Sequence, residues 1–229
     1  MRLFVMVVAL AAGMAAAEPV QLAYFDLPPF AFAPQGGPAF AMAQAMVADL
    51  DVAVRPDSMP IRRLAFEASK SPVIIAAIVR SPEREQLYQW IGRYCTDGFV
   101  IATVAPHPLV NSLAEARTLK SIAVAAGAAN ESFLRARGFT NLDPAASIGL
   151  EVRRLAEGHD EAWFAPRAGA LHAWKEAGYD PAQLGFGAAI TDASTWMAAS
   201  KSVPAEMVKI LRARFADKLK EGAVTGCPE

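Results

Sequence analysis

Short apolar runs and longer stretches with helical spacing alternate along this chain. The clearest run covers residues 73–79, and seven consecutive apolar residues are typical of a strand buried on both faces of a sheet. Shorter runs predict further strands at 20–24, 52–55, 98–104, 121–125, 161–164 and 195–199. Helical spacing predicts helices at 39–50, 60–68, 131–137, 147–157, 167–177 and 204–220. This alternation predicts an α/β protein.

The order of these elements predicts two similar lobes. Residues 18–97 with 199–229 would form lobe 1, and residues 98–198 would form lobe 2. The chain would cross between them near Gly98 and Thr195. The last helix carries Leu211 and Phe215 four residues apart, so it should pack against lobe 1 through an apolar stripe.

The N-terminal segment has the pattern of a signal peptide. Arg2 precedes an apolar stretch, and three alanines at 15–17 form a small-residue cleavage site. We therefore expect residues 1–17 to be removed and the remainder to be an exported, periplasmic protein that does not insert into the membrane. An uncleaved N-terminal anchor is the alternative.

Charge and composition argue against several classes of function. The net charge is −1, from 22 basic and 23 acidic residues, which does not favour binding to nucleic acid or to an anionic membrane. The sequence has no HExxH, P-loop, GxSxG, GxGxxG or CxxC motif. We expect no metal, no cofactor and no enzymatic activity.

The two cysteines, Cys95 and Cys227, favour a disulfide. Export makes such a bond permissible, and two free thiols would be a liability in an oxidising compartment. Two unrelated thiols are the alternative.

Two arginines follow the long apolar run, within RSPERE at 80–85. A serine and a proline form a helix-start signal, which places Arg80 at the end of the strand and Arg84 in the first turn. Open α/β sheets bind ligands at the carboxyl ends of their strands, and guanidinium groups suit carboxylates. We predict capture of a small anionic or zwitterionic solute. Alternatively, Arg84 pairs with a neighbouring glutamate at the surface, and Arg80 pins the strand end to a carboxylate.

Several segments occur in a characteristic order: YFDLPPF at 24–30, RSPERE with a tryptophan at 90, SIAVAAGAANESFLRARGF at 121–139, LAEGHDEAWF at 155–164, and the long last helix. Together they resemble the bacterial periplasmic solute-binding proteins of the polar amino-acid type (extracellular solute-binding protein family 3). The resemblance implies a type II fold of two hinged α/β lobes that close on a solute. It also implies that an inner-membrane ABC permease accepts the loaded form, and we expect a monomer.

Position by position, the resemblance makes Arg84 the arginine that holds the solute carboxylate. Leu27 and Met59 fall where side chains cover the solute. Ala129 and Asn130 match the second-lobe turn at a helix N-terminus, although Asn130 could simply cap that helix.

Three further candidates flank the expected cleft. Tyr24 and Phe30 bracket a loop that the family uses as a cleft wall. The alternative is that both belong to the core, and for Phe30 the two positions are equally compatible with the sequence. Arg62 opens a helix that should point at the cleft edge, so it is a candidate for the mouth.

One departure from the family concerns the aspartate that holds a ligand ammonium group. Counting from Gly158, its place is taken by Pro166. We therefore expect a solute with a carboxylate and no adjacent cation, or a larger molecule held in another way. Two other functions stay open: a dehydratase-like periplasmic enzyme using Asp26, Glu83 or Asp160, and a sensory or accessory binding protein.

Overall fold

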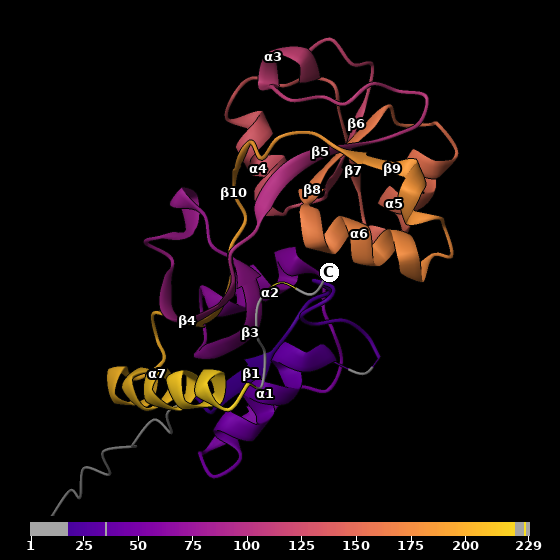
Figure 1. Ribbon diagram of the computed structural model, residues 1–229. Helices are drawn as coiled ribbons and strands as arrows, with labels where there is room; N and C mark the ends of the chain where they lie inside the picture. Colours follow the sequence, from indigo (N-terminus) through magenta and orange to yellow (C-terminus); the bar gives the residue numbers. More distant parts are fainter. Residues whose placement is uncertain (1–17, 35, 223–226, 228–229) are drawn as a thin grey trace, which may run out of the picture.

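Two β-sheets divide the chain into two lobes in the computed structural model, which describes residues 18–34, 36–222 and 227 (Figure 1). The expected signal peptide, residues 1–17, lies outside the described residues. The α/β class and the two-lobe arrangement predicted from the sequence are confirmed.

Lobe 1 contains a five-stranded sheet in the order β2-β1-β3-β11-β4. Its strands are β1 (Val20–Ala23), β2 (Val52–Val54), β3 (Val73–Val79), β4 (Tyr88–Cys95) and β11 (Thr195–Ser200). Its helices are α1 (Gly37–Val47), α2 (Ile61–Ala68) and α7 (Ala205–Lys220). Every residue of β3 is buried, as its apolar run predicts. The last helix, α7, packs on lobe 1 through Leu211 and Phe215, as expected (Figure 1).

Lobe 2 contains a six-stranded sheet in the order β10-β5-β8-β6-β7, with β9 paired to β5. Its strands are β5 (Gly98–Val104), β6 (Ile122–Ala125), β7 (Leu142–Ala145), β8 (Ala162–Pro166), β9 (Leu184–Phe186) and β10 (Thr191–Asp192). Its helices are α3 (Leu113–Ala116), α4 (Ala129–Arg135), α5 (Ile148–Ala156) and α6 (Arg167–Glu176). The short 3₁₀ helix η2 (Pro181–Gln183) precedes β9.

The chain passes between the lobes at residues 96–97 and 193–194. Asp97 joins the two crossings, because its carbonyl oxygen accepts a hydrogen bond from the Ala193 N–H at 2.8 Å. Its carboxylate accepts from the N–H of Gly98 at 2.7 Å and of Ala168 at 3.0 Å, so it also caps the first turn of α6. Burial raises the pKa of Asp97. The strand β11, which begins at Thr195, pairs with β3 and β4 of lobe 1.

The segment after β3 differs from its sequence prediction. The predicted helix start yields only one 3₁₀ turn, η1 (Pro82–Arg84), and the Ser81 side chain makes no capping hydrogen bond. The chain then enters β4, which pairs with β11. The unpredicted β7 contains an aspartate and Pro144, which is tolerated because β7 lies at the edge of its sheet.

The predicted disulfide between Cys95 and Cys227 is present, with an S–S distance of 2.05 Å. It ties Cys227 to the end of β4. Within the described part of the chain, no helix has both the length and the apolar character required to cross a membrane.

Candidate functional site

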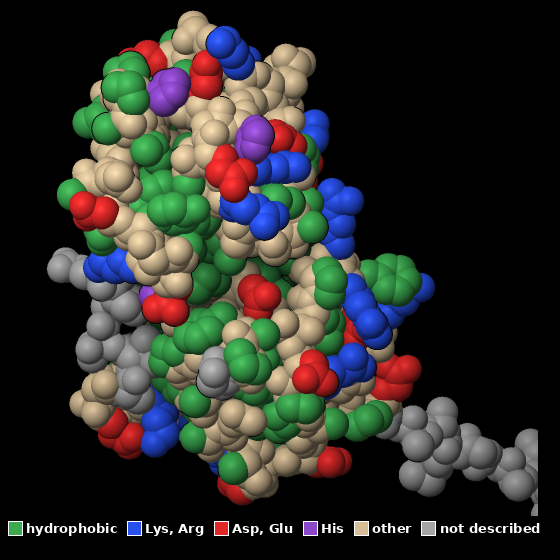
Figure 2. Space-filling view, turned by 90° about the vertical axis from the view of Figure 1, so that its right-hand side faces the viewer, with side chains coloured by type: hydrophobic (Ala, Val, Ile, Leu, Met, Phe, Trp, Pro, Cys, Tyr) green, Lys and Arg blue, Asp and Glu red, His purple; other side chains and the backbone are tan. Residues whose placement is uncertain are grey.

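A cavity of about 280 Å³ lies between the two lobes. Lobe 1 contributes the loop after β1, the residues leading into α2, the end of β3, and η1. Lobe 2 contributes the ends of β6, β7 and β8 and the first turns of α4, α5 and α6. In the space-filling view, hydrophobic side chains gather around the hollow at the waist of the molecule (Figure 2). Most of the cavity wall is apolar, and its three charged residues are Asp26, Arg84 and Glu151.

The lobes touch each other around this cavity. Leu27 packs against hydrophobic clusters of both lobes. The Phe32 ring lies 5.8 Å from the ring of His172 on α6, measured between centroids. A Cβ atom on Gly169 of α6 would lie 3.1 Å from the Pro28 carbonyl oxygen, so a small residue suits this approach. These contacts join the two lobes at the edge of the cavity.

Arg84 brings an unpaired positive charge to the cavity wall. Its Nη1 donates a hydrogen bond to the Val79 carbonyl oxygen at 3.0 Å, and the guanidinium forms no ion pair with a described residue. Burial lowers the pKa of Arg84, with smaller opposing effects from Tyr88 and Glu83. Guanidinium carries five N–H donors, so most of them are free for a bound anion.

Arg80 has the structural role that the sequence left open. Its Nη2 donates to Oε2 of Glu85 at 3.0 Å. Its guanidinium also lies over the rings of Trp90 and Trp196, at 5.0 and 4.5 Å from their centroids. It is not among the residues that line the cavity.

Tyr24 and Phe30 also lie away from the cavity, in the core of lobe 1. The Tyr24 hydroxyl donates to the Pro56 carbonyl oxygen at 3.0 Å, and its ring packs 4.3 Å from that of Phe40. Successive residues of an extended segment point to opposite sides. Phe25, the residue after Tyr24, therefore faces the other way and lines the cavity.

Besides Arg84, four predicted residues line the cavity: Leu27, Met59, Ala129 and Asn130. Asn130 is buried, and its own lobe holds its side chain. Nδ2 donates to the Phe164 carbonyl oxygen at 2.8 Å, and Oδ1 accepts from the Glu131 N–H at 3.0 Å. These two bonds hold the Asn130 side chain within lobe 2, but Asn130 does not cap α4, because the N-cap residue is Ala128 and no side chain caps this helix.

Arg62 lies at the edge of the cleft and joins the lobes. Its Nη2 is 3.5 Å from Oε2 of Glu131 on α4. Oε2 also accepts a hydrogen bond from the Gly127 N–H, and Oε1 accepts one from Nε of Arg135. Burial raises the pKa of Glu131, but these donors outweigh it and lower the pKa overall. Gly127 has φ +79°, and any Cβ there would collide with the Arg62 side chain.

Glu151 on α5 lines the cavity and was not predicted. Its exposed fraction is 3%, and its Oε1 has no hydrogen-bond partner. Burial raises its pKa to about 8; Trp163 opposes the rise, and the charge of Asp160 adds to it. Ile148, Glu151, Val152 and Leu155 follow the i, i+3, i+4, i+7 spacing of a buried helix face. An acidic residue on this apolar helix face can be recognised from the sequence alone.

The three acidic residues considered for an enzymatic function, Asp26, Glu83 and Asp160, do not lie together at the cavity. Asp26 lines the cavity and accepts a hydrogen bond from the Ala33 N–H at 3.0 Å. The Ser81 side chain lowers the pKa of Glu83, which is exposed and does not line the cavity. Asp160 is buried, which raises its pKa, and it also lies away from the cavity wall. No cluster of three potential metal ligands occurs among the described residues.

No protein-family model matches the chain. A search of curated proteins finds no significant match. Solved structures do resemble it. A histidine kinase sensor domain with similarity to periplasmic binding proteins superposes with a TM-score of 0.76 at 16% identity, covering 90% of this chain and 92% of that one.

Two further structures are amino-acid binders. The GluR0 ligand-binding core from Nostoc punctiforme, in complex with L-glutamate, has a TM-score of 0.76 at 16% identity, covering 90% and 95% of the two chains. An amino acid ABC transporter substrate-binding protein from Streptococcus pneumoniae, bound to L-arginine, has a TM-score of 0.73 at 17% identity, covering 90% of each chain. The chain thus has the two-lobe periplasmic-binding-protein fold.

Proposed function

We propose that this protein is a periplasmic solute-binding protein. It captures a small carboxylate-bearing solute between its lobes as a monomer and presents it to an ABC-type permease. The observation that carries the proposal is the Arg84 guanidinium, which faces an apolar interlobe cavity without a counter-ion. A partly buried cation without a partner is unfavourable, and a ligand carboxylate would supply that partner.

The mechanism is hinge closure. A ligand shifts an open–closed equilibrium only by its difference in affinity for the two forms. A carboxylate on Arg84 anchors the solute to lobe 1. Apolar contacts with Leu27 and Met59, and with Ala129 on the other lobe, are then made together only in the closed form. The cavity of about 280 Å³ suits a solute about the size of an amino acid.

The test begins with a thermal-shift screen of amino acids, monocarboxylates, dicarboxylates and aromatic acids. A compound at about 100 times its Kd adds about 2.7 kcal/mol of stability, which such a screen detects. Calorimetry on Arg84→Ala should then show an affinity at least about 100-fold weaker, because the carboxylate loses its only unpaired cationic partner on the cavity wall.

Arg63→Ala is the matched control. Arg63 lies on α2 of the same lobe, is largely exposed, and pairs with Glu67 rather than facing the cavity. Its loss should leave solute affinity unchanged. Equal affinity of wild type and Arg84→Ala for every compound in the screen would refute the proposed site.

A second candidate is a sensory role, which the likeness to the histidine kinase sensor domain favours. Solute capture would be the same, and only the partner of the closed form would differ. Stimulation of a reconstituted permease's ATPase by the loaded protein supports transport. A solute-dependent complex with a kinase and no such stimulation supports the sensory role.

A further inference from the structure

We infer that Glu151 is a second ligand-binding residue, which takes the cationic nitrogen of an amino-carboxylate solute while Arg84 takes its carboxylate. This inference rests on the function proposed above and narrows the class of solute. It assigns to α5 the acidic contact that is absent at Pro166.

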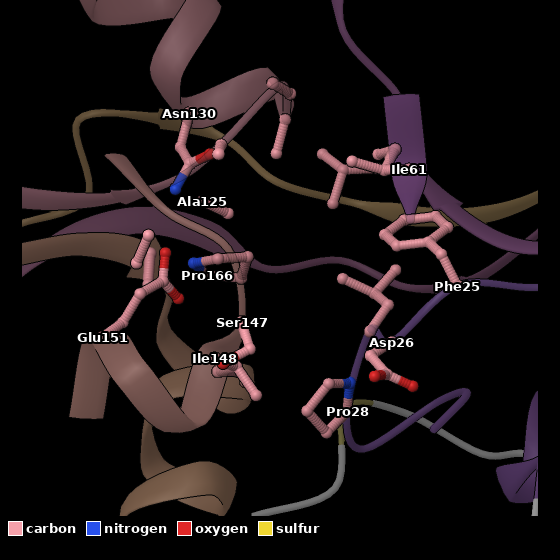
Figure 3. A pocket seen from close by; sticks show the side chains of 18 of the residues that line it. Phe25, Asp26, Pro28, Ile61, Ala125, Asn130, Ser147, Ile148, Glu151 and Pro166 are labelled. Atoms are coloured by element: carbon pink, nitrogen blue, oxygen red, sulfur yellow. The ribbon is translucent and has the colours of Figure 1, made fainter. Parts of the chain in front are cut away.

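Glu151 is directed into the cavity by the start of α5. The Ser147 hydroxyl caps this helix by accepting a hydrogen bond from the Leu150 N–H at 3.3 Å. Val152 and Leu155 turn into the core of lobe 2, and Glu151 turns toward the pocket (Figure 3). The helix therefore fixes the carboxyl at the wall instead of leaving it on a mobile loop.

Among the described residues, this carboxyl has no charged partner. Oε1 of Glu151 and Nε1 of Trp163, which also lines the cavity, form no hydrogen bond of normal geometry, although Trp163 lies close enough to lower the pKa of Glu151. The negative charge of Asp160 further disfavours ionisation of Glu151. Buried polar atoms almost always have partners, so unpaired ones on a cavity wall point to a bound molecule that supplies them.

The two unpaired ionisable groups have opposite charges and lie on different lobes. Figure 3 shows Glu151 and Asn130 of lobe 2 across the pocket from Phe25 and Ile61 of lobe 1. A solute with a carboxylate and an amine at separate positions pairs both Arg84 and Glu151. A monocarboxylate leaves Glu151 unpaired. Because the amino-carboxylate contacts charged groups of both lobes, it favours closure more strongly.

Matched pairs of compounds test this inference: alanine and propanoate, 4-aminobutanoate and butanoate, 5-aminopentanoate and pentanoate. Calorimetry on the wild type should show that at least one amino-carboxylate binds about 30-fold or more tightly than its partner without the amine. In Glu151→Gln this preference should fall to a few-fold. Glu176→Gln, which removes an exposed carboxylate from α6, should retain the preference.

A second measurement needs no variant. Calorimetry of the wild type in two buffers of different ionisation enthalpy counts the protons exchanged on binding. Near neutral pH the amino-carboxylate should release close to one proton, because Glu151 must ionise to pair with the cation.

The outcomes separate this inference from the proposed function. Equal binding of both members of every pair, or a preference that survives in Glu151→Gln, overturns the inference, and so does binding without proton release. Arg84→Ala still abolishes carboxylate binding in those cases if the proposed function is correct. Failure of all amino-carboxylates to bind overturns the inference directly.

Discussion

Replacing Glu151 with glutamine should change how the stability of the empty protein depends on pH. The pKa of this carboxyl is about 8 in the folded protein, against an ordinary value of 4.5. Below about pH 4.5 it is protonated in both the folded and unfolded states, so it costs nothing. As the pH rises, the unfolded chain ionises first, and folding stability is lost progressively until the folded state also ionises near pH 8.

The magnitude follows from the pKa difference of about 3.5. At about 1.4 kcal/mol for each unit, the cost is about 3 kcal/mol at pH 7 and about 5 kcal/mol above pH 8. Glutamine keeps the shape and cannot ionise. The stability of Glu151→Gln relative to wild type should therefore rise by about these amounts with pH.

Urea unfolding followed by circular dichroism, from about pH 4.5 to about pH 8.5, measures this difference. Glu176→Gln makes the same chemical change on the exposed surface of α6 and should follow the wild-type profile. Parallel profiles for wild type and Glu151→Gln would refute the reasoning, because they would mean that the carboxyl is solvated or paired in the folded protein.

Three further predictions concern the residues around the site. Cys95→Ser should cost about 2–5 kcal/mol of unfolding free energy in urea under oxidising conditions, because the bond to Cys227 closes a long loop, and reducing agent should bring wild type to the same stability. Arg62→Ala should weaken solute binding only a few-fold, and less at high salt, because the Arg62 side chain is largely exposed and Glu131 keeps its hydrogen bonds from Gly127 and Arg135; a loss of more than about tenfold by calorimetry would contradict this. Arg80→Ala should lower the Tm but leave the Kd unchanged, so any large change in Kd would return Arg80 to the site.

Much of the fold follows from local patterns in the sequence. The apolar run at 73–79 coincides with β3, and the predicted helix at 147–157 matches α5, which Ser147 caps. The strand β4 was missed because a helix-start signal precedes it and its buried and exposed positions do not alternate regularly. What decides its conformation is pairing with β11, more than 100 residues away, which no local pattern reports.

The site is less predictable than the fold, because a side chain's direction depends on packing between distant segments. Arg84 lines the cavity, whereas Arg80, four residues earlier, is held between two tryptophans. Tyr24 and Phe25 are adjacent in the sequence, but Tyr24 packs in the core of lobe 1 and Phe25 lines the cavity. Glu151 was not predicted because the resemblance points to the acidic position that Pro166 occupies, although its place on the apolar face of α5 is visible in the sequence.

The fastening at Asp97 restricts how the two halves can swing. Its backbone carbonyl holds the returning strand at Ala193, and its carboxylate holds the start of α6, so Asp97 travels with lobe 2 as one piece. On the other side, the Arg80 N–H donates to the Ser194 carbonyl oxygen, and Cys95 is bonded to Cys227 in lobe 1. The joint is thereby shortened to Thr96 on one strand and the Ala193–Ser194 link on the other. In the hinge closure proposed above, two such short links side by side would define one axis of rotation and would resist twisting about any other.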